Sequence, residues 1–304
     1  MASLVGAGVG RIDAQRRERD RRRQVLGDPA APWIYLIVAT GDIREDVVQA
    51  QAAAREGADI VAVIRSTGQD STVRVDAAGA ELRGFSVDGS GTRFDTTDAA
   101  VRVHGDDVVV RDLTVRGALF GIIAERSNRV AVTGNRIVGD AETTDGLRGD
   151  GIRFWEVRGG RIESNLMEDS RDVAVWYSPG TRLTGNTVRR SRYGAHFMFS
   201  SDSLVEHNRY ETDVVGVFIM YSRGIAVRDN VISGSASPDG MGLGAKDSGD
   251  VTIERNRFTR DRQCLYIDNS PSGEGQTLTA RDNVFASCAA AVTFHRSETR
   301  TTFA

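Results

Sequence analysis

Short runs in which apolar and polar residues alternate recur along most of the chain, and most of these runs end at an asparagine. Residues 204–208 and 225–230 are two of them. Alternation with a period of two is typical of β-strands. A unit that returns at a nearly fixed interval predicts a solenoid built from such strands. The marker residues are 21 to 30 positions apart, and they are Phe85, Leu113, Asn135, Asn165, Asn186, Asn208, Asn230, Asn256 and Asn283.

A second strand follows most markers after eight residues, and it follows two of them later, after insertions. In each of these strands two apolar residues separated by one position point to the same side, which we interpret as the interior of a coil. The sequence therefore predicts an all-β fold, a right-handed parallel β-helix of roughly nine coils. The predicted interior pairs are Ile122/Ala124, Ile152/Phe154, Ala174/Trp176, Ala195/Phe197, Val217/Ile219, Leu243/Ala245, Leu265/Ile267 and Val292/Phe294.

The repeated asparagine predicts two features of the coil. Asparagine suits a turn in which the backbone enters the left-handed region. Stacked from coil to coil, its side-chain amide can also bond to the next asparagine and form a ladder. The unequal spacings of the markers predict that insertions are placed in loops along one edge of the coil.

The first 70 residues do not follow the repeat. Residues 33–39 and 60–64 are continuous apolar runs that suit buried strands, and residues 43–56 between them have a helical composition. We expect a β-α-β unit in a separate region, 1–70, followed by the β-helix over 71–304. The unit could cap the open first coil.

The same region resembles part of the α subunit of lysine 5,6-aminomutase. The resemblance rests on PWIYLIVATGD at 32–42 and RSTGQ at 65–69, and it ends after Gln69. That family is a barrel enzyme that uses adenosylcobalamin and pyridoxal phosphate. One or two βα units cannot close a barrel or enclose a cofactor, so we expect none of that activity in this chain.

Composition excludes several classes of function. The net charge of −3 and the pI of about 5.9 give neither a nucleic-acid footprint nor a polybasic membrane patch. No apolar run is long enough to span a bilayer, and residues 11–23 are rich in charge where a secretory leader would be apolar. The two cysteines, Cys264 and Cys288, do not form a disulfide framework, and we interpret Cys264 as a small core residue.

From about Ser71 to Phe294 the chain resembles the NosD family, periplasmic β-helix proteins of nitrous-oxide-reductase maturation. The resemblance implies a periplasmic, copper-binding, non-catalytic accessory protein. It implies as partners an ABC-type membrane transporter and either the reductase or a copper carrier. The segments that carry it are RYGAHFMFS at 192–200, MYS at 220–222, GLGAKD at 242–247, GDGI at 149–152 and LYID at 265–268.

The side chains that alternate with the interior set should form the outer face of the coil. Coils are stacked about 4.8 Å apart, so each column is a ladder of near neighbours. We expect Met198 directly beside Met220, with His196 on the same face. One column reads Ile123, Arg153, Val175, His196, Phe218, Gly244, Tyr266 and Thr293, and the other reads Glu125, Trp155, Tyr177, Met198, Met220, Lys246, Asp268 and His295.

Two thioethers and one imidazole are ligands that suit Cu(I). We therefore interpret His196, Met198 and Met220 as a candidate metal site. The same residues could instead pack against a partner protein, and the two readings are compatible. An exposed strip of apolar, aromatic and charged residues is typical of a binding face, and we assign to it Trp155, Tyr177, Phe218, Lys246, Tyr266 and Asp268.

The alternative is a carbohydrate-active β-helix, a polysaccharide lyase, epimerase or sugar-binding module. Trp155 and Tyr177 could stack on sugars, and Arg153, Lys246 and Tyr266 could act on an acidic sugar. Against this, the sequence offers no compact carboxylate set for calcium. Its best carboxylate pair, Glu125 and Asp268, would lie six coils apart. We therefore assign no catalytic residue.

Overall fold

The computed structural model describes residues 35–38, 43–58, 60–63, 72–89, 91, 93–296 and 301–303, together with positions 17 and 21. The chain divides into two compact units, residues 1–33 and 34–304. The second unit begins with the expected β-α-β elements, namely β1 (Tyr35–Val38), α2 (Ile43–Arg55) and β2 (Ile60–Val63), with β1 and β2 paired in parallel. Residues 33, 34, 39 and 64 of the predicted strands lie outside the described residues.

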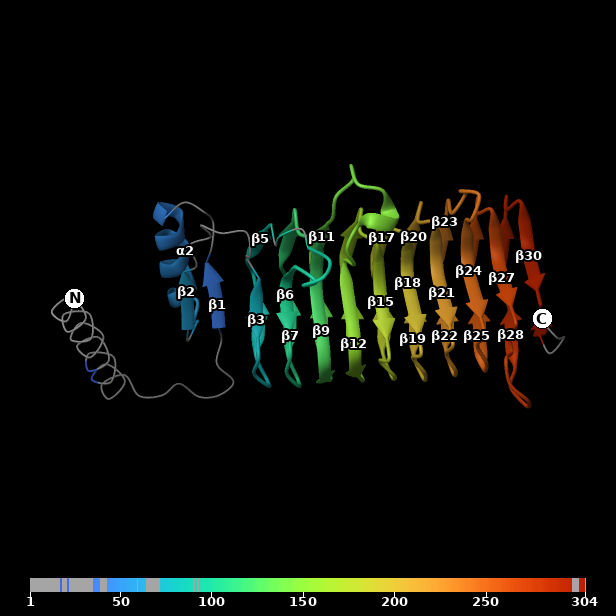
Figure 1. The fold of residues 1–304 in the computed structure, drawn as a ribbon, viewed down its shortest axis with the longest axis horizontal. Helices are drawn as coiled ribbons and strands as arrows, with labels where there is room; N and C mark the ends of the chain where they lie inside the picture. Colours follow the sequence, from blue (N-terminus) through green and yellow to red (C-terminus); the bar gives the residue numbers. More distant parts are fainter. Residues whose placement is uncertain are drawn as a thin grey trace. The chain divides into compact units, whose positions relative to one another are not determined.

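The remaining strands form three parallel sheets, and each strand pairs with the equivalent strand of the coils before and after it (Figure 1). Sheet 1 contains β3 (Val73–Val75), β6 (Ala99–Val103), β9 (Phe120–Asn128), β12 (Ile152–Arg158), β15 (Asp172–Trp176), β18 (Tyr193–Met198), β21 (Val215–Met220), β24 (Met241–Lys246), β27 (Gln263–Asp268) and β30 (Ala290–His295). Sheet 2 contains β4 (Glu81–Arg83), β7 (Val109–Arg111), β10 (Ala131–Thr133), β13 (Arg161–Glu163), β16 (Arg182–Thr184), β19 (Leu204–Glu206), β22 (Ala226–Arg228), β25 (Val251–Glu254), β28 (Leu278–Arg281) and β31 (Thr301–Phe303). Sheet 3 contains β5 (Ser86–Asp88), β8 (Thr114–Arg116), β11 (Arg136–Val138), β14 (Leu166–Glu168), β17 (Thr187–Arg189), β20 (Arg209–Glu211), β23 (Val231–Ser233), β26 (Arg257–Thr259) and β29 (Val284–Ala286).

One strand from each sheet makes one coil, or rung, of a parallel β-helix. The described chain has nine complete rungs, from β3–β4–β5 to β27–β28–β29, followed by β30 and β31. The predicted fold and the predicted number of coils are therefore confirmed. Alternate residues of all three sheets fill a single apolar core inside the coil, because period-two alternation turns every second side chain inward.

The asparagine ladder is confirmed. From Asn135 to Asn256, each side-chain Nδ2 donates to Oδ1 of the next asparagine at 2.9–3.0 Å, and each backbone N–H donates to the same oxygen. The prediction that these asparagines are left-handed is wrong. The residue before each of the seven is left-handed instead, with φ between 53° and 66°. The asparagine that follows this turn directs its amide into the stack.

A serine ladder marks another corner, after sheet 1. The backbone N–H of Ser178 donates to Ser200 Oγ at 2.9 Å, and the same bond recurs from Ser200 to Ser222, from Ser222 to Ser248 and from Ser248 to Ser270. The serines that end the repeated motifs at 200 and 222 therefore stabilise a turn of the backbone.

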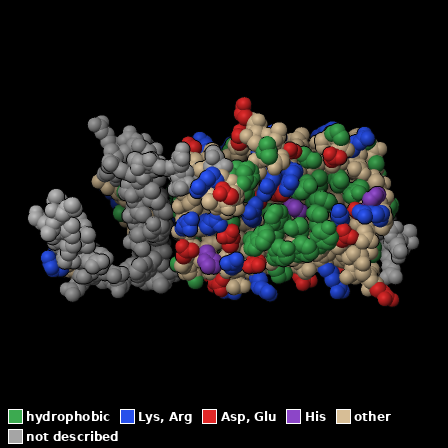
Figure 2. Space-filling model, in the orientation of Figure 1, with side chains coloured by type: hydrophobic (Ala, Val, Ile, Leu, Met, Phe, Trp, Pro, Cys, Tyr) green, Lys and Arg blue, Asp and Glu red, His purple; other side chains and the backbone are tan. Residues whose placement is uncertain are grey.

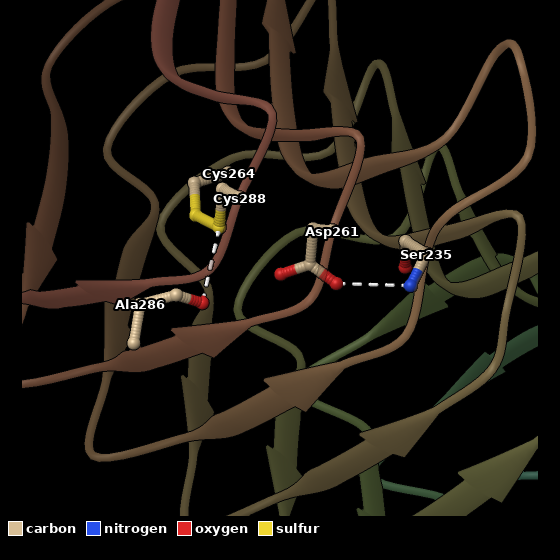
Figure 3. Close-up of a disulfide and its surroundings, with 5 residues drawn as sticks. All are labelled: Ser235, Asp261, Cys264, Ala286 and Cys288. Carbon is tan, nitrogen blue, oxygen red and sulfur yellow. Dashed lines mark hydrogen bonds between the residues drawn. A yellow bond between two sulfur atoms is a disulfide. The ribbon is translucent and has the colours of Figure 1, made fainter.

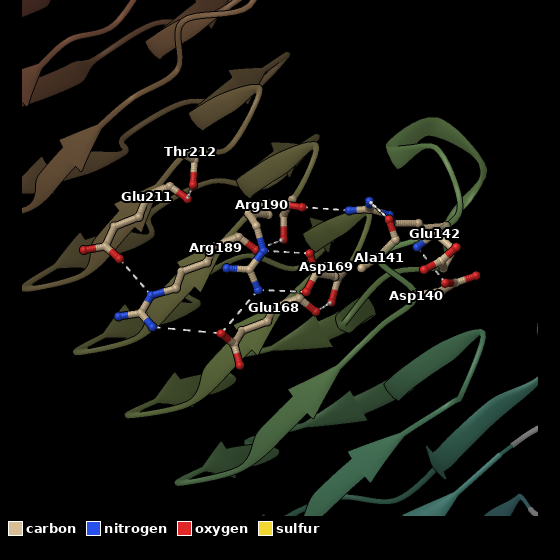
Figure 4. A network of polar contacts seen from close by, with 12 residues as sticks. Asp140, Ala141, Glu142, Glu168, Asp169, Arg189, Arg190, Glu211 and Thr212 are labelled. Atoms are coloured by element: carbon tan, nitrogen blue, oxygen red, sulfur yellow. Dashed lines mark hydrogen bonds and ion pairs between the residues drawn. The ribbon is translucent and has the colours of Figure 1, made fainter.

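Three long insertions lie where sheet 3 leads to sheet 1, at 89–98, 139–151 and 234–240. A fourth, at 269–277, lies between sheets 1 and 2, so the prediction that all insertions share one edge is wrong. The loop 139–151 contains η1 (Asp145–Leu147), and Arg148 of this loop donates to the carbonyls of Arg190 and Ala141. Arg190 in turn pairs with Asp169 at 2.8 Å (Figure 4). A hydrogen bond from Arg148 to the Arg190 carbonyl therefore joins the loop to the turn after β17.

The rung that contains β15 departs from the predicted register by one residue. Its marker spacing is only 21 residues, and a bulge in the pairing of β15 with β18 absorbs the difference. Val173 and Val175 therefore face the core, whereas Ala174 lies beside His196 and Trp176 beside Met198. The predicted interior pair Ala174/Trp176 is wrong. The predicted outer positions of Val175 and Tyr177 belong instead to Ala174 and Trp176.

The two cysteines of the chain form a disulfide (Figure 3). Cys264 is fully buried, as a core residue should be, but it also forms a disulfide with Cys288. Sequence reasoning missed this disulfide because its two cysteines come together only when adjacent rungs pair.

The helical segments within the described residues are too short or too polar to cross a bilayer.

A candidate metal-binding and docking face

The outer face of sheet 1 carries the predicted site residues in adjacent rungs. Met198 and Met220 are direct partners in the pairing of β18 with β21. Trp176 precedes them in this column, and Lys246 and Asp268 follow. Both methionines are half-buried, so their thioethers lie outside the core and are partly covered. The predicted juxtaposition of the two sulfur side chains is present in the structure.

His196 lies two residues before Met198 on the same strand and the same face. Its side chain is almost fully covered, with only 5% of the residue exposed, although sequence reasoning placed it on an exposed strip. Nδ1 of the imidazole lies 3.3 Å from Asp172 Oδ2 and 3.4 Å from Trp176 Nε1. The two contacts require opposite tautomers. We assign Nδ1–H as the donor to Asp172, because a charged acceptor makes the stronger bond.

This tautomer leaves the lone pair on Nε2. That nitrogen is buried and has no hydrogen-bond partner among the described residues. A carboxylate behind a histidine, with the opposite ring nitrogen open, is the arrangement that orients metal-binding histidines. Asp172 therefore orients the His196 ring so that its Nε2 lone pair is available to a ligand.

Asp172 is itself fully buried and charged. Burial alone would raise the pKa of its carboxyl, but hydrogen bonds from His196 and Arg192, with the charge of Arg192, outweigh burial and lower the pKa below its ordinary value. Arg192 Nε lies 2.9 Å from Asp172 Oδ1, and a second guanidinium nitrogen contacts the other oxygen. The carboxylate is thus ionised and has fixed partners on both sides.

Three aromatic rings enclose the imidazole. The ring centroids of Tyr193, Trp176 and Phe218 lie 4.9, 5.5 and 6.1 Å from that of His196. Gly244 on the next rung leaves the space that Phe218 occupies, since a Cβ there would lie 2.7 Å from Phe218 Cδ2. The GLGAKD segment therefore shapes the aromatic wall of the site.

A second row of aromatic residues lies beside the methionines, at the turn that follows sheet 1. Tyr177, Phe199 and Tyr221 stack almost parallel, with centroids 5.1 and 5.0 Å apart, and are 42%, 46% and 42% exposed. All three have left-handed backbones, with φ of 49–52°. Such a backbone is rare for bulky side chains and destabilising by roughly 1–2 kcal/mol per residue. Trp155 extends the row, 5.3 Å from Tyr177.

Cationic side chains border this apolar surface. Arg153 and Arg171 both donate to the fully buried Asp150, at 2.6 and 2.8 Å, and the Arg153 guanidinium lies 5.2 Å from the centre of the Trp176 ring. Figure 2 shows a hydrophobic patch over the middle rungs with Lys and Arg side chains beside it. We call the exposed or half-buried Trp155, Trp176, Tyr177, Met198, Phe199, Met220 and Tyr221 the apolar patch.

The remaining predicted face residues lie farther along the coil. Lys246 follows Met220 in the column and is half-buried. Tyr266 is half-buried one rung beyond Gly244. Asp268 is buried and bound by His295 at 3.1 Å and by Arg296 at 3.0 Å. Burial opposes the ionisation of Asp268, yet these partners hold its pKa below the ordinary value.

Sequence reasoning missed several residues of the site, and Asp150, Asp172 and Trp176 show why. Asp172 and Trp176 were hidden by the one-residue shift in their rung, and the spacing of 21 was the signal that could have found them. Asp150 lies at the end of a long insertion, where the repeat gives no register. Each is therefore brought to the site by tertiary pairing.

Two family models match different parts of the chain. A family model described as periplasmic copper-binding protein (NosD) matches residues 129–304. Another, described as the D-lysine 5,6-aminomutase TIM-barrel domain of the alpha subunit, matches residues 1–100 and so extends beyond Gln69. The probable ABC transporter binding protein NosD of Stutzerimonas stutzeri is 31% identical over 113 residues, which are 36% of this chain and 26% of that protein. The lysine 5,6-aminomutase alpha subunit of Fusobacterium nucleatum subsp. nucleatum is 56% identical over 86 residues, which are 28% of this chain and only 16% of that protein.

Solved structures support the fold. Endopolygalacturonase I from Stereum purpureum superposes with a TM-score of 0.54 at 13% identity, over 78% of this chain and 91% of the other. DFA-IIIase from Arthrobacter chlorophenolicus A6 without its lid superposes with a TM-score of 0.50 at 16% identity, over 79% of this chain and 64% of the other. At these identities the likeness concerns the β-helix alone.

Proposed function

Because the chain belongs to the NosD family of periplasmic copper-binding proteins, we propose that it is a non-catalytic accessory protein that helps mature the copper centre of nitrous oxide reductase. It binds Cu(I) transiently at His196, Met198 and Met220. It docks on an ABC-type membrane transporter, and on the reductase or a copper carrier, through the outer face of sheet 1.

The observation that carries the copper half of this proposal is the state of His196. Its Nδ1 is held by Asp172 at 3.3 Å, and its Nε2 has no hydrogen-bond partner among the residues that the structure describes. The thioethers of Met198 and Met220, soft ligands for Cu(I), lie next along the same face. Neutral ligands bind Cu(I) less firmly than thiolates, which suits transfer.

The docking half is supported by the apolar patch and its border. Tyr177, Phe199 and Tyr221 are exposed although their backbones are strained. The same corner is left-handed in other rungs, where Glu156, Asp247 and Asn269 occupy it. The turn therefore does not require an aromatic residue, and three exposed rings in a row are typical of an interaction surface. The patch lies next to the copper ligands, so a partner that covers it would exclude water from the ion. The neighbouring arginines favour a partner with acidic groups around an apolar centre.

One observation weighs against glycoside hydrolysis by the face residues. Glu125 and Asp268 are separated by six steps along the column that runs through Trp155, Trp176, Met198, Met220 and Lys246. At about 4.8 Å a step this is nearly 30 Å, whereas hydrolytic carboxylates lie roughly 5–10 Å apart. This pair therefore cannot act as acid and base on one bond.

A Cu(I) competition titration tests the copper half. The wild type and a Met198→Leu/Met220→Leu variant compete with a chromophoric Cu(I) chelator under anaerobic conditions. Leucine keeps the volume and removes the sulfur. We expect at least a tenfold loss of affinity in the variant. Equal uptake by both proteins would remove the proposed site.

A matched control uses the neighbouring positions on the same two rungs. Phe199→Leu/Tyr221→Leu removes exposed aromatic surface and leaves both methionines unchanged. This variant should keep the copper affinity and lose binding to the partner protein. A control that lost copper as severely as the methionine variant would show that the effect is structural.

A further inference from the structure

A polar cavity lies on the outer side of sheet 1, in the rungs of β3, β6, β9 and β12 that precede the methionines. Its volume is about 470 Å³, within the range of roughly 300–1,000 Å³ that is common for small-molecule sites. Most such sites are mainly apolar, whereas six of the eight residues that line this one are titratable. In Figure 2, basic, acidic and histidine side chains gather over the first rungs, beside the hydrophobic patch. A ligand for this cavity is therefore strongly polar.

We infer that the cavity binds an acidic saccharide, a short chain of sugar rings that carry carboxylates. The inference does not rest on the proposed function, because none of the proposed copper ligands lines the cavity.

The first support is an arginine without a counter-charge. Arg74 of β3 lies directly beside Arg102 of β6, and like charges that face each other on a sheet are destabilising. Arg102 is offset by Glu125, whose Oε2 accepts its hydrogen bond at 2.8 Å. Arg74 is exposed and forms no ion pair within the part of the chain that the structure describes. A carboxylate would offset its charge, and a guanidinium can bind one through two parallel hydrogen bonds.

The cavity is also held open by the protein itself. Arg102 donates to the carbonyl oxygens of Thr97 and Thr96, at 2.7 and 3.3 Å, in the loop before β6. Together with its bond to Glu125, these contacts fix the loop at the edge of the cavity. A preformed site loses little conformational entropy when a ligand binds. Arg102 thus shapes the site, and Arg74 is the cation that is open to a ligand.

The second support is a column of hydrogen-bond acceptors beside the arginines. Asp76, His104 and Glu125 follow one another from rung to rung, since the residues before them pair in register. Asp76 and His104 are exposed, and Asp76 Oδ1 lies 3.8 Å from His104 Nδ1, which is too long for a hydrogen bond. The hydroxyl groups of a sugar can donate to such acceptors. An acidic peptide would instead place its own carboxylates beside those of Asp76 and Glu125.

The third support is an aromatic ring in a fixed orientation. Trp155 follows Glu125 in the same column and is half-buried. Its ring packs against those of Trp176 and Tyr177, with centroids 5.7 and 5.3 Å apart. An aromatic side chain offers a large, rigid apolar surface, on which the apolar face of a sugar ring can stack. Charged groups and one aromatic ring in a single cavity suit a saccharide better than an inorganic anion.

A second open cation indicates a chain of rings in place of a single one. Arg126 is 74% exposed, and its nearest ion-pair partner, Glu156, lies 3.5 Å from its Nε. Arg126 belongs to the third rung and Arg74 to the first, so their strands lie about 10 Å apart. One short saccharide can therefore present separate carboxylates to both arginines.

Isothermal titration calorimetry of the full chain tests the inference. The probes are the trisaccharides of galacturonate and of mannuronate, with maltotriose as the uncharged control. We expect the wild type to bind at least one acidic trisaccharide, and to bind maltotriose at least about tenfold more weakly. The variant Arg74→Gln/Arg126→Gln should lose about tenfold or more in affinity for the acidic probe, because it loses hydrogen bonds between charged groups.

The matched control is Arg182→Gln/Arg257→Gln, which removes two exposed arginines from sheets 2 and 3. It has the same net charge as the cavity variant and should bind like the wild type. Trp155→Leu should weaken binding, and Trp155→Phe should retain most of it. Both arginine variants should keep the wild-type affinity for Cu(I), so the copper site and the saccharide site can fail separately.

Four results would overturn the inference. They are no binding of either acidic trisaccharide at millimolar concentration, equal affinity for maltotriose, and equal losses in the two arginine variants. The fourth is binding of polyglutamate in place of the saccharides, which would assign the cavity to an acidic polypeptide.

Discussion

Removal of one central asparagine should destabilise the β-helix far more than its size suggests. The side chain of Asn208 makes four hydrogen bonds. Its Oδ1 accepts from the backbone N–H and from Nδ2 of Asn186 at 2.9 and 3.0 Å. Its Nδ2 donates to the Leu183 carbonyl at 2.9 Å and to Asn230 Oδ1 at 3.0 Å.

The substitution Asn208→Ala leaves three buried groups without these partners: the N–H of Asn186, one N–H of its side chain and the Leu183 carbonyl. Asn230 Oδ1 keeps the bond from the Asn208 backbone N–H. A buried polar group without a partner is destabilising by about 1–3 kcal/mol. We expect the free energy of unfolding to fall by at least about 3 kcal/mol, a large fraction of the roughly 5–15 kcal/mol of a natural domain.

Urea unfolding of the full chain, followed by circular dichroism, measures the loss, and hydrogen exchange of the Asn186 amide locates it. The matched control is Asn283→Ala at the last ladder position. That side chain makes the same bonds to Asn256, at 2.9 and 3.0 Å, but it is only half-buried, so water can replace it. The control should lose less than about 1 kcal/mol. Equal losses at the two positions, or a loss below about 1 kcal/mol at Asn208, would refute the reasoning.

Three other variants test the site and its surroundings. Asp213→Asn should stabilise the chain by about 1–3 kcal/mol at pH 7, because complete burial raises the pKa of Asp213 well above its ordinary 3.8. With this raised pKa, the stability of the wild type falls as the pH rises from 3.8 toward the pKa of the folded state. The urea midpoints of the two proteins should therefore converge below about pH 4. Asp172→Asn should weaken Cu(I) binding by roughly 10–100-fold in the chelator competition, because a neutral amide orients His196 less firmly than the carboxylate does; unchanged affinity would separate Asp172 from the metal site. Gly244→Ala should lower the urea midpoint by the equivalent of about 1–3 kcal/mol, since its Cβ would meet Phe218 at 2.7 Å, and an unchanged near-ultraviolet circular dichroism spectrum would contradict displacement of that ring.

The local pattern predicted most of the fold. Alternation of apolar residues and the recurring asparagine gave the sheets, the ladder and the pairing of Met198 with Met220. The reason is that a β-helix repeats the same contacts on each rung, so one local unit contains the information for the whole stack. Where neighbouring rungs have the same length, residues one repeat apart in the sequence lie side by side in the structure.

Tertiary structure decided what the pattern could not contain. A rung of 21 residues moved Trp176 into the outer column and brought Asp172 behind His196, because one missing residue turns a whole strand over. The disulfide between Cys264 and Cys288 likewise depends on two rungs lying in register. The sequence by itself determined the period and the outward face of each regular strand. The insertions, the bulge and the burial of His196 were decided by the packing of one rung on the next, since only that contact fixes which side chains share a site.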